Sequence, residues 1–481
     1  MRALLGPLAS EALDRGEVVP ARRVVAQSSQ PLASAVSLLL IGDAVASAEV
    51  ARTFGEALPA LHPWLIGEDE LRCSIELAPH GFDAEDWLVA ADWPPRRASG
   101  EVPTDHVLGV GGASTMLAQC TVRPTVQRSL DVGTGCGVQA LHLSRHSRSV
   151  VATDISQRAL RLAAFNAALN DIELELRHGS LFEPVAGERF DLVVANPPFV
   201  IGAPVSSQRE YRDAGRPGDE VCATLVRSAH EHLTEGGWCQ LLANWEIGSD
   251  GEWSRGPAQW LDGSPLDAWV LQREVQDPAA YVETWLRDAQ QHLTPGYEAA
   301  YDAWLGGLQA RGVVGVGFGL VTLRAGGSAD PVRRFQHHDG PLAQPIAPAV
   351  EGWFARQDLL AARPGAEVLT LVLHLAADVR VDSSRRPGHG PTERVVVQES
   401  GLRFTGTLDG FGERLLDRVA SQPPGSAVAV GEIVAGLALD EGLAPADVLG
   451  AAVPVLRRLV EEGFLLPGDL SGATPTGPPP V

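Results

Sequence analysis

Two short stretches of this chain carry residues whose types and spacing suit chemistry on a bound ligand. The first is Asp131-Val132-Gly133-Thr134-Gly135-Cys136-Gly137, which follows a run of apolar residues. Glycines at Gly133, Gly135 and Gly137 permit a tight turn between a strand and a helix and let backbone N–H groups face a ligand. The spacing is not the dinucleotide fingerprint Gly-x-Gly-x-x-Gly, because position 138 is Val138.

Two carboxylates accompany this turn. Asp131 stands just before the glycines, where it suits a cationic amino group better than a pyrophosphate. Asp154 follows the next strand-like run, where its oxygens suit a pair of ribose hydroxyls. An amino acid joined to a nucleoside fits both acids, and S-adenosylmethionine is such a molecule. The stretch therefore predicts a site for this cofactor, with a plain strand-to-helix turn as the alternative.

The second stretch is Asn196-Pro197-Pro198-Phe199, again after an apolar run. The Asn196 amide oxygen and the Pro197 carbonyl can both accept from one planar NH2 group, which favours a pyramidal nitrogen able to attack a methyl group. Pro197 and Pro198 stiffen the loop, and Phe199 offers a stacking face. We expect positioning to supply most of the rate effect, without a metal or a covalent nucleophile. An ordinary Asn-Pro turn is the alternative.

Both stretches lie in a region where strand-like and helical patterns alternate. The predicted strands include residues 130–132, 149–153, 172–176, 190–195, 238–243, 266–273 and 313–323. The predicted helices between them cover residues 138–145, 157–170 and 219–233. Farther along, residues 368–374 and 394–398 are strand-like, and residues 411–420 and 446–462 are helix-like. The alternation predicts an α/β fold with a doubly wound, mostly parallel sheet of seven strands, and ligands at the carboxyl ends of the strands.

The patterns divide the chain into several predicted parts. Residues 1–93 read as a small helical, winged-helix-like module, and residues 105–325 hold the sheet. An aromatic-rich helical insertion at about 278–310 either caps a substrate or fills the core. Residues 345–467 predict a second small α+β module, also winged-helix-like. Residues 468–481, rich in proline and glycine, predict a disordered tail.

Composition excludes several kinds of chemistry. The formal net charge of −22 argues against broad, salt-driven binding to nucleic acid. Arg333-Arg334 and His337-His338 form a local basic patch, for which we favour a solvated face over a nucleic-acid groove. The chain contains no lysine, which rules out a Walker-type loop, a Schiff-base lysine and a lysine general base.

Cysteine usage and hydropathy bear on location. The five cysteines are odd in number and form no Cys-x-x-Cys pair, which argues against a disulfide framework or a zinc site. No long apolar signal core follows Met1, and the apolar run at residues 36–41 is too short to span a bilayer. We expect a cytoplasmic protein with no membrane partner.

Three weaker candidates remain. His142 and His146 have the spacing of paired metal ligands, but Leu143 stands where a His-Glu-x-x-His site needs its acid, so a packed or solvated helix face is favoured. Residues 105–114 are rich in glycine and either approach a ligand or form a turn. Tyr211-Arg212-Asp213 either contacts a substrate or forms a plain surface loop.

Taken together, Asp131 to Gly137, Asp154 and Asn196 to Phe199 resemble a class I S-adenosylmethionine-dependent methyltransferase of the Asn-Pro-Pro-Tyr/Phe group, over roughly residues 105–325. That group includes the HemK/PrmC-like glutamine methyltransferases that act on release factors. It also includes enzymes that methylate exocyclic amines of adenine or guanine. The flanking parts resemble those of actinobacterial multi-domain members.

The resemblance implies roles for individual residues. Cofactor binding falls to Asp131, Gly133, Gly135, Gly137 and Asp154, with Ser180 and Leu181 beside the adenine. The target nitrogen is held by Asn196 and Pro197, in one motif with Pro198 and Phe199. Two departures matter: Ser180 stands where many relatives carry an acid, and Phe199 replaces the tyrosine common in glutamine methyltransferases.

The expected activity is methylation of a planar amide or amine nitrogen with S-adenosylmethionine as cofactor. A protein glutamine side chain, on a translation factor for example, is the first substrate, since the acidic charge disfavours RNA. An exocyclic amine of adenine or guanine in RNA or DNA is the second, and the Phe199 form of the motif supports it. A cofactor-binding regulatory protein is the alternative of a different class.

Overall fold

The computed structural model describes residues 1–82, 85–94, 103–202, 218–288, 295–388, 391–423 and 425–468. It divides into two compact units, Met1–Leu117 with Thr125–His338, and Ala118–Pro124 with Asp339–Val481. The residues of the predicted tail from 469 onward and the stretch Tyr211-Arg212-Asp213 lie outside the described residues.

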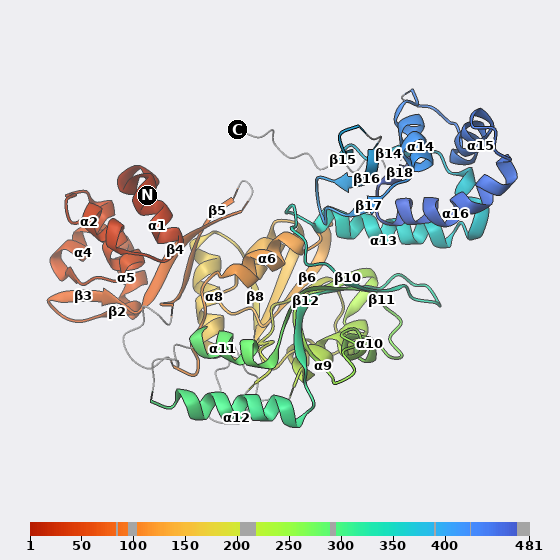
Figure 1. Ribbon diagram of the computed structural model, residues 1–481. Helices are drawn as coiled ribbons and strands as arrows, with labels where there is room; N and C mark the ends of the chain where they lie inside the picture. Colours follow the sequence, from red (N-terminus) through yellow and green to blue (C-terminus); the bar gives the residue numbers. More distant parts are fainter. Residues whose placement is uncertain are drawn as a thin grey trace. The chain divides into compact units, whose positions relative to one another are not determined.

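The first unit is organised around an eight-stranded sheet with the spatial order β13-β11-β12-β10-β9-β6-β7-β8 (Figure 1). Its strands are β6 (Val126–Val132), β7 (Ser147–Asp154), β8 (Glu175–His178), β9 (Phe190–Ala195), β10 (Leu233–Ile247), β11 (Asp267–Gln276), β12 (Gly315–Arg324) and β13 (Arg333–His337). Only β12 runs antiparallel to its neighbours, β10 and β11. The predicted α/β fold with a mostly parallel sheet is therefore confirmed.

The predicted strand count of seven is one short, because β13 pairs in parallel with β11. The sequence predicts a basic, solvated face for these residues. Instead, Arg333 donates to the carbonyls of Leu266 and Ser264, and Arg334 stacks over the Trp269 ring at 4.9 Å. This short polar strand is held by residues that are distant in sequence. It therefore lacks the local hydrophobic pattern from which a strand is predicted.

The order of strands creates a reversal at β6. The chain runs from β6 through α7 (Val138–Ser144) to β7 and through α8 (Gln157–Leu169) to β8, then returns to β9 on the other side of β6. Right-handed crossovers in opposite directions put α7 and α8 on one face and α9 (Glu220–Ser228) on the other. Val132 pairs with Ala195, so the segments after β6 and β9 start side by side.

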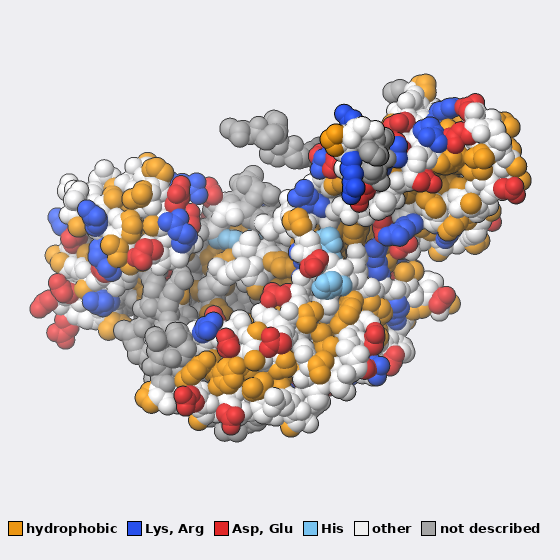
Figure 2. All heavy atoms as spheres, viewed as in Figure 1, with side chains coloured by type: hydrophobic (Ala, Val, Ile, Leu, Met, Phe, Trp, Pro, Cys, Tyr) orange, Lys and Arg blue, Asp and Glu red, His pale blue; other side chains and the backbone are white. Residues whose placement is uncertain are grey.

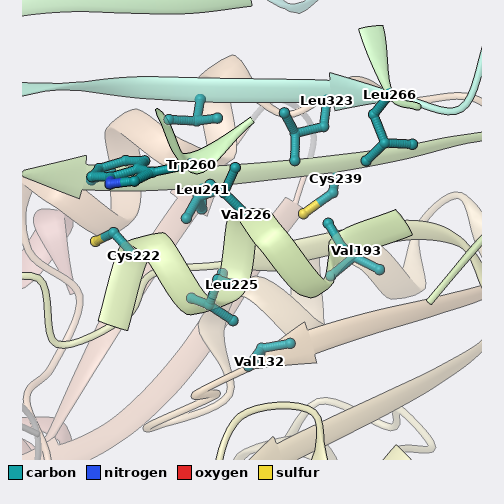
Figure 3. Close-up of a cluster of buried hydrophobic side chains, with 14 of the residues drawn as sticks. Val132, Val193, Cys222, Leu225, Val226, Cys239, Leu241, Trp260, Leu266 and Leu323 are labelled. Carbon is teal, nitrogen blue, oxygen red and sulfur yellow. The ribbon is translucent and has the colours of Figure 1, made fainter. Parts of the chain in front are cut away.

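The face covered by α9 and α10 (Arg255–Trp260) carries a large hydrophobic core. Figure 3 shows Cys222, Leu225 and Val226 of α9 packed against side chains of the sheet. Along β10 alternate residues enter this core, as a two-residue period requires: Cys239, Leu241, Ala243, Trp245 and Ile247. Each large side chain buried there contributes about 1.5–3 kcal/mol, which fixes the strand ends that carry the candidate site.

The N-terminal segment shares a core with the sheet's helices. It contains α1 (Arg2–Asp14), α2 (Val19–Val25), α3 (Pro31–Val36), α4 (Ser47–Phe54) and α5 (Leu58–Leu61), then the hairpin β4 (Ile75–Phe82) and β5 (Glu85–Asp92). Trp87 and Val89 of the hairpin belong to one buried cluster with Leu141 of α7 and Leu162 of α8. The hairpin is therefore packed on the helices that flank the glycine turn.

The aromatic-rich insertion lies between β11 and β12, as predicted, and forms α11 (Pro278–Asp288) and α12 (Tyr297–Ala310). Its buried cluster includes Val200 and Ile201, just after the Asn-Pro-Pro-Phe stretch. The Ile201 N–H donates to the Tyr281 hydroxyl at 2.7 Å, and the Trp304 indole N–H donates to the Ile201 carbonyl at 3.0 Å. The insertion thus holds both the backbone N–H and the backbone carbonyl of Ile201.

The second unit is an α+β module. Its main elements are α13 (Ala347–Ala361), α14 (Gly410–Ala420), α15 (Val430–Asp440), α16 (Pro445–Glu461), β14 (Leu373–Leu375), β15 (Val379–Arg385), β16 (Pro391–Gln398), β17 (Thr405–Thr407) and β18 (Leu465–Pro467). The strand predicted at 368–374 is wrong in its first half, where Gly365–Thr370 forms a 3-10 helix. The Thr370 hydroxyl bonds to the Glu367 carbonyl at 2.7 Å, and this local turn outweighs the β-propensity of the sequence.

Among the described residues, no helix is long and apolar enough to cross a bilayer.

Candidate active site

A cavity of about 510 Å³ opens at the carboxyl ends of β6, β7, β8 and β9. It is lined by residues 106–109 and 111–114, the glycine turn, Asp154 to Ser156, Gly179 to Leu181, Asn196 to Val200 and, from α11, Trp285 and Asp288. Its volume is in the range of small-molecule sites. The two stretches singled out in the sequence therefore share one cavity.

The glycine turn brings the backbone close to the cavity. Gly133 and Gly135 have left-handed φ values of 72° and 56°, and a Cβ on either would meet no atom within 4 Å. Gly137 does not line the cavity; a Cβ there would lie 3.2 Å from Ala163 of α8, so its place is a packing contact. The missing side chains of Gly133 and Gly135 leave room for a ligand, and the missing side chain of Gly137 lets α8 pack closely against the turn.

The expectation that the turn's N–H groups face a ligand needs correction. The N–H groups of Gly133 and Thr134 both donate to the Thr153 carbonyl at 2.9 Å, and that of Gly135 donates to Asp154 at 2.9 Å. Strand β7 lies in register beside β6 and supplies these acceptors. The glycines therefore leave room for a ligand, but their backbone N–H groups are not free to donate hydrogen bonds to it.

Asp131 is fully buried beneath the turn and is not a lining residue. Its Oδ2 accepts from the Thr134 hydroxyl at 2.6 Å and from the Ala140 N–H at 3.0 Å. Its Oδ1 is buried and has no partner among the described residues. Burial raises the pKa of this carboxyl to about 7. One oxygen fixes the turn, and the other is the kind of orphaned acceptor that an ammonium group satisfies.

The raised pKa of Asp131 predicts a pH-dependent stability. The folded pKa lies above the ordinary value of 3.8 for an aspartic acid, so the folded state holds a proton that the unfolded state releases, and stability falls as pH rises through about 7. We expect Asp131→Asn to flatten this loss between pH 5 and pH 8. Urea unfolding of the cofactor-free protein at both pH values checks it; equal pH dependence in variant and wild type would contradict it.

Asp154 stands half-buried at the end of β7 and lines the cavity. Its Oδ2 accepts from Gly135 N–H, and its Oδ1 accepts from Ser156 N–H at 2.8 Å. A carboxylate offers about four lone pairs, so it can also accept from two hydroxyls. Ser180 and Leu181 line the cavity after β8, the next strand of the sheet. These residues fit the nucleoside half of S-adenosylmethionine.

Asn196 enters the same cavity directly after β9. Its Oδ1 is buried without a partner among the described residues, and its Nδ2 donates to the Ser114 hydroxyl at 3.3 Å. The Ser114 carbonyl in turn accepts from Gln139 of α7 at 2.8 Å. Ser114 lies in the glycine-rich segment flagged in the sequence, whereas nothing local marked Gln139.

The far wall of the cavity is aromatic. Phe199 and Trp285 of α11 lie edge to face, with ring centroids 6.3 Å apart at 66°. Pro197 and Pro198 line the cavity beside them. The predicted insertion therefore both fills a core and reaches the site.

The hydrogen bonds from α11 and α12 to the Ile201 backbone give a testable prediction. Tyr281→Phe removes the hydroxyl that accepts from Ile201 N–H and from Asn244 Nδ2, the latter at 3.3 Å. A buried donor left unpaired costs about 1–3 kcal/mol, and we expect kcat for methyl transfer to fall about tenfold while cofactor affinity is kept. Tyr301→Phe is the control, because its hydroxyl bonds Glu283 away from the loop. Equal kinetics for both variants would refute a role in positioning the loop.

Of the two histidines considered as metal ligands, only His142 lies on α7, whereas His146 follows the end of this helix and is half-buried. His142 is buried, with its Nε2 3.1 Å from Nε2 of His80 and its ring edge-on to Trp87 at 4.9 Å. No group of three His, Cys, Asp or Glu residues suited to a metal is found in the described ranges.

Comparison with known proteins agrees with this geometry. A family model described as "Methyltransferase small domain" matches residues 109–251, and two models described only as domains of unknown function match residues 1–63 and 351–467. The ribosomal protein uL3 glutamine methyltransferase of Bradyrhizobium diazoefficiens is 33% identical over 191 residues, which cover 37% of this chain and 59% of that protein.

Two further relatives are similar over shorter stretches. The release factor glutamine methyltransferase of Xylella fastidiosa is 36% identical over 26% of this chain and 49% of its own length. The ribosomal RNA small subunit methyltransferase C of Escherichia coli is 33% identical over 28% of this chain and 36% of its own length. The chain thus spans between about a third and three fifths of these curated relatives. With the sheet and cavity above, these matches show that the central part of the chain is a class I S-adenosylmethionine-dependent methyltransferase domain related to the HemK/PrmC-like enzymes.

Proposed function

We propose that this protein transfers a methyl group from S-adenosylmethionine to a planar nitrogen, with a protein glutamine side chain as the first substrate. The observation that carries the proposal is the Asn196 Oδ1, a buried acceptor without a partner among the described residues, in the cavity that also holds Asp154. An unpaired buried acceptor costs about 1–3 kcal/mol, so a ligand donor is expected there.

The cofactor, when bound, supplies an electrophilic methyl group. Asp154 would accept from the ribose hydroxyls, and the carboxylate of Asp131, buried beneath the turn and not lining the cavity, would compensate the ammonium charge electrostatically. Asn196 and the Pro197 carbonyl accept the two hydrogens of the target nitrogen and orient its lone pair. Since the nitrogen and methyl are held by neighbouring strands, the contribution of the protein is mainly proximity and orientation.

Charge favours a protein substrate over a nucleotide. The charged side chains that line the cavity in the described residues are Asp154 and Asp288, both acidic. On the face drawn in Figure 2, described acidic and basic side chains are intermixed rather than sorted into one basic surface. Two of the relatives are named for glutamine methylation of a ribosomal protein or a release factor. A translation factor in the cytoplasm is accordingly the proposed kind of partner.

An exocyclic base amine is the second candidate. The Phe199 and Trp285 rings offer a flat group an aromatic wall, and stacking of this kind is worth about 1–3 kcal/mol per base. One relative is named for ribosomal RNA. A regulatory protein that binds the cofactor without using it is the remaining alternative.

One experiment separates the three. The full chain is incubated with methyl-labelled S-adenosylmethionine and cell lysate, with and without ribonuclease. We expect ribonuclease-resistant label in protein, recovered as methylated glutamine after proteolytic digestion. Ribonuclease-sensitive label would favour the base amine, and cofactor binding with no labelled product would favour the regulatory protein.

A further inference from the structure

We infer that Asn166 is a positioning residue that joins the N-terminal hairpin β4–β5 to the cofactor turn, so that hairpin docking and S-adenosylmethionine binding stabilise each other. This inference rests on the cofactor binding of the proposed function and not on the identity of the methylated substrate. It assigns a task to the N-terminal segment.

Asn166 lies on α8 with a fully buried side chain and bonds two separate segments. Its Oδ1 accepts from Ala90 N–H of β5 at 2.7 Å, and its Nδ2 donates to the Ala90 carbonyl at 2.8 Å. The second Nδ2 hydrogen goes to the Cys136 carbonyl of the glycine turn, also at 2.8 Å. Cys136 lines the cavity. A single amide therefore spans the hairpin and the wall of the cofactor site.

One helical turn later, Asn170 repeats only half of this arrangement. Its Oδ1 accepts from Leu88 N–H at 3.0 Å, and its Nδ2 donates to the Leu88 carbonyl at 2.9 Å. Its remaining bond goes to the Asn166 carbonyl at 2.7 Å, within α8. Asn170 thus docks the same strand without touching the turn, which makes it a matched control.

The strand held by these asparagines also carries the segment beside the cavity. At the end of β5, Asp92 pairs with Arg158 of α8 and accepts from Val107 N–H at 2.8 Å. Val107 lines the cavity, and the Asp92 N–H donates to its carbonyl at 3.0 Å. Two walls of the cofactor site, the turn and the segment from residue 106, therefore depend on the position of β5.

Coupling of this kind is reciprocal by thermodynamic necessity. If the hairpin steadies the turn through Asn166, the bound cofactor must steady the hairpin through the same amide. A side chain that only packs the hairpin would affect stability without affecting cofactor affinity. The two properties can be measured separately.

The test compares Asn166→Ala and Asn170→Ala in the full chain by calorimetric titration with S-adenosylmethionine and by thermal unfolding. We expect both variants to have a lower Tm. Only Asn166→Ala should weaken the cofactor, by about tenfold, the effect of one lost buried hydrogen bond. Unchanged affinity in Asn166→Ala, or an equal loss in Asn170→Ala, would overturn the inference.

Hydrogen exchange on the wild-type protein and on Asn170→Ala gives a second readout. Cofactor should slow exchange of the Ala90 amide, and the effect should survive in Asn170→Ala. No change at Ala90 in a protein that binds cofactor would overturn the inference while leaving the proposed function intact. A wild-type chain that binds no cofactor would overturn both.

Discussion

Replacing Asn196 with alanine is expected to lower kcat for methyl transfer by about 100- to 1,000-fold, the loss typical of one preorganised polar group at a reacting centre. The amide oxygen is buried in the cavity and engaged by no described residue, so we expect its partner to be a donor that arrives with the substrate. The proposed cofactor contacts follow β6, β7 and β8, so we expect the affinity for the cofactor to stay unchanged. Initial rates on the labelled substrate and calorimetric titration with cofactor measure the two effects.

Asn196→Asp is the matched variant. It keeps an acceptor oxygen toward the substrate, and the Ser114 hydroxyl can turn from accepting to donating, so the remaining contact is preserved. We expect a clearly smaller loss than for alanine. If alanine and aspartate fall equally, the acceptor is not what the reaction uses, and if alanine transfers at the wild-type rate, Asn196 does not hold the nitrogen.

The sheet was predictable because its strands carry long apolar runs. Parallel strands are buried on both faces, so the buried parts of β7 and β9 contain the short continuous apolar runs Val150 to Ala152 and Leu192 to Ala195. The antiparallel β12 was also recognisable from its length. Strand β13 was not, since Arg333 and Arg334 are held by carbonyls and a ring more than sixty residues away.

The site was predictable where a residue directly follows a strand. Asp154 and Asn196 meet in one cavity because their strands flank β6. The segments that contain Ser114 and Tyr281 were singled out in the sequence, but their contacts were not predictable, since each acts across a long stretch of chain: Ser114 contacts Asn196 at a separation of 82 residues, and Tyr281 contacts Ile201 at a separation of 80. Local spacing carries no trace of such pairs.

Asp131 shows a different limit. Its place before the glycines suggested a ligand contact, but the structure puts the carboxylate beneath the turn, where Thr134 and Ala140 use one oxygen. The sequence identifies the acid and the glycine turn. Which N–H groups of the turn find acceptors within the protein depends on the register of β6 with β7, which the sequence does not give.

Asp154→Asn is expected to raise the dissociation constant of S-adenosylmethionine by about 100-fold, since hydrogen bonds to a charged group contribute about 1.5–3 kcal/mol each. The amide would also turn a donor toward Gly135 N–H or Ser156 N–H, both of which need acceptors. Asp191→Asn is the control: Asp191 likewise accepts from two backbone N–H groups, Gln127 and Arg128, but does not line the cavity. We expect it to cost stability and leave cofactor affinity unchanged.

A cofactor analogue separates the two tasks of Asp154. S-adenosylhomocysteine and a form lacking the ribose hydroxyls are titrated into wild type and Asp154→Asn. If Asp154 binds the hydroxyls, wild type loses affinity for the deoxy form, while the variant hardly distinguishes the two ligands. If the variant loses the same factor for both ligands, Asp154 acts only through the Gly135 turn, and its proposed contact with the ribose is refuted.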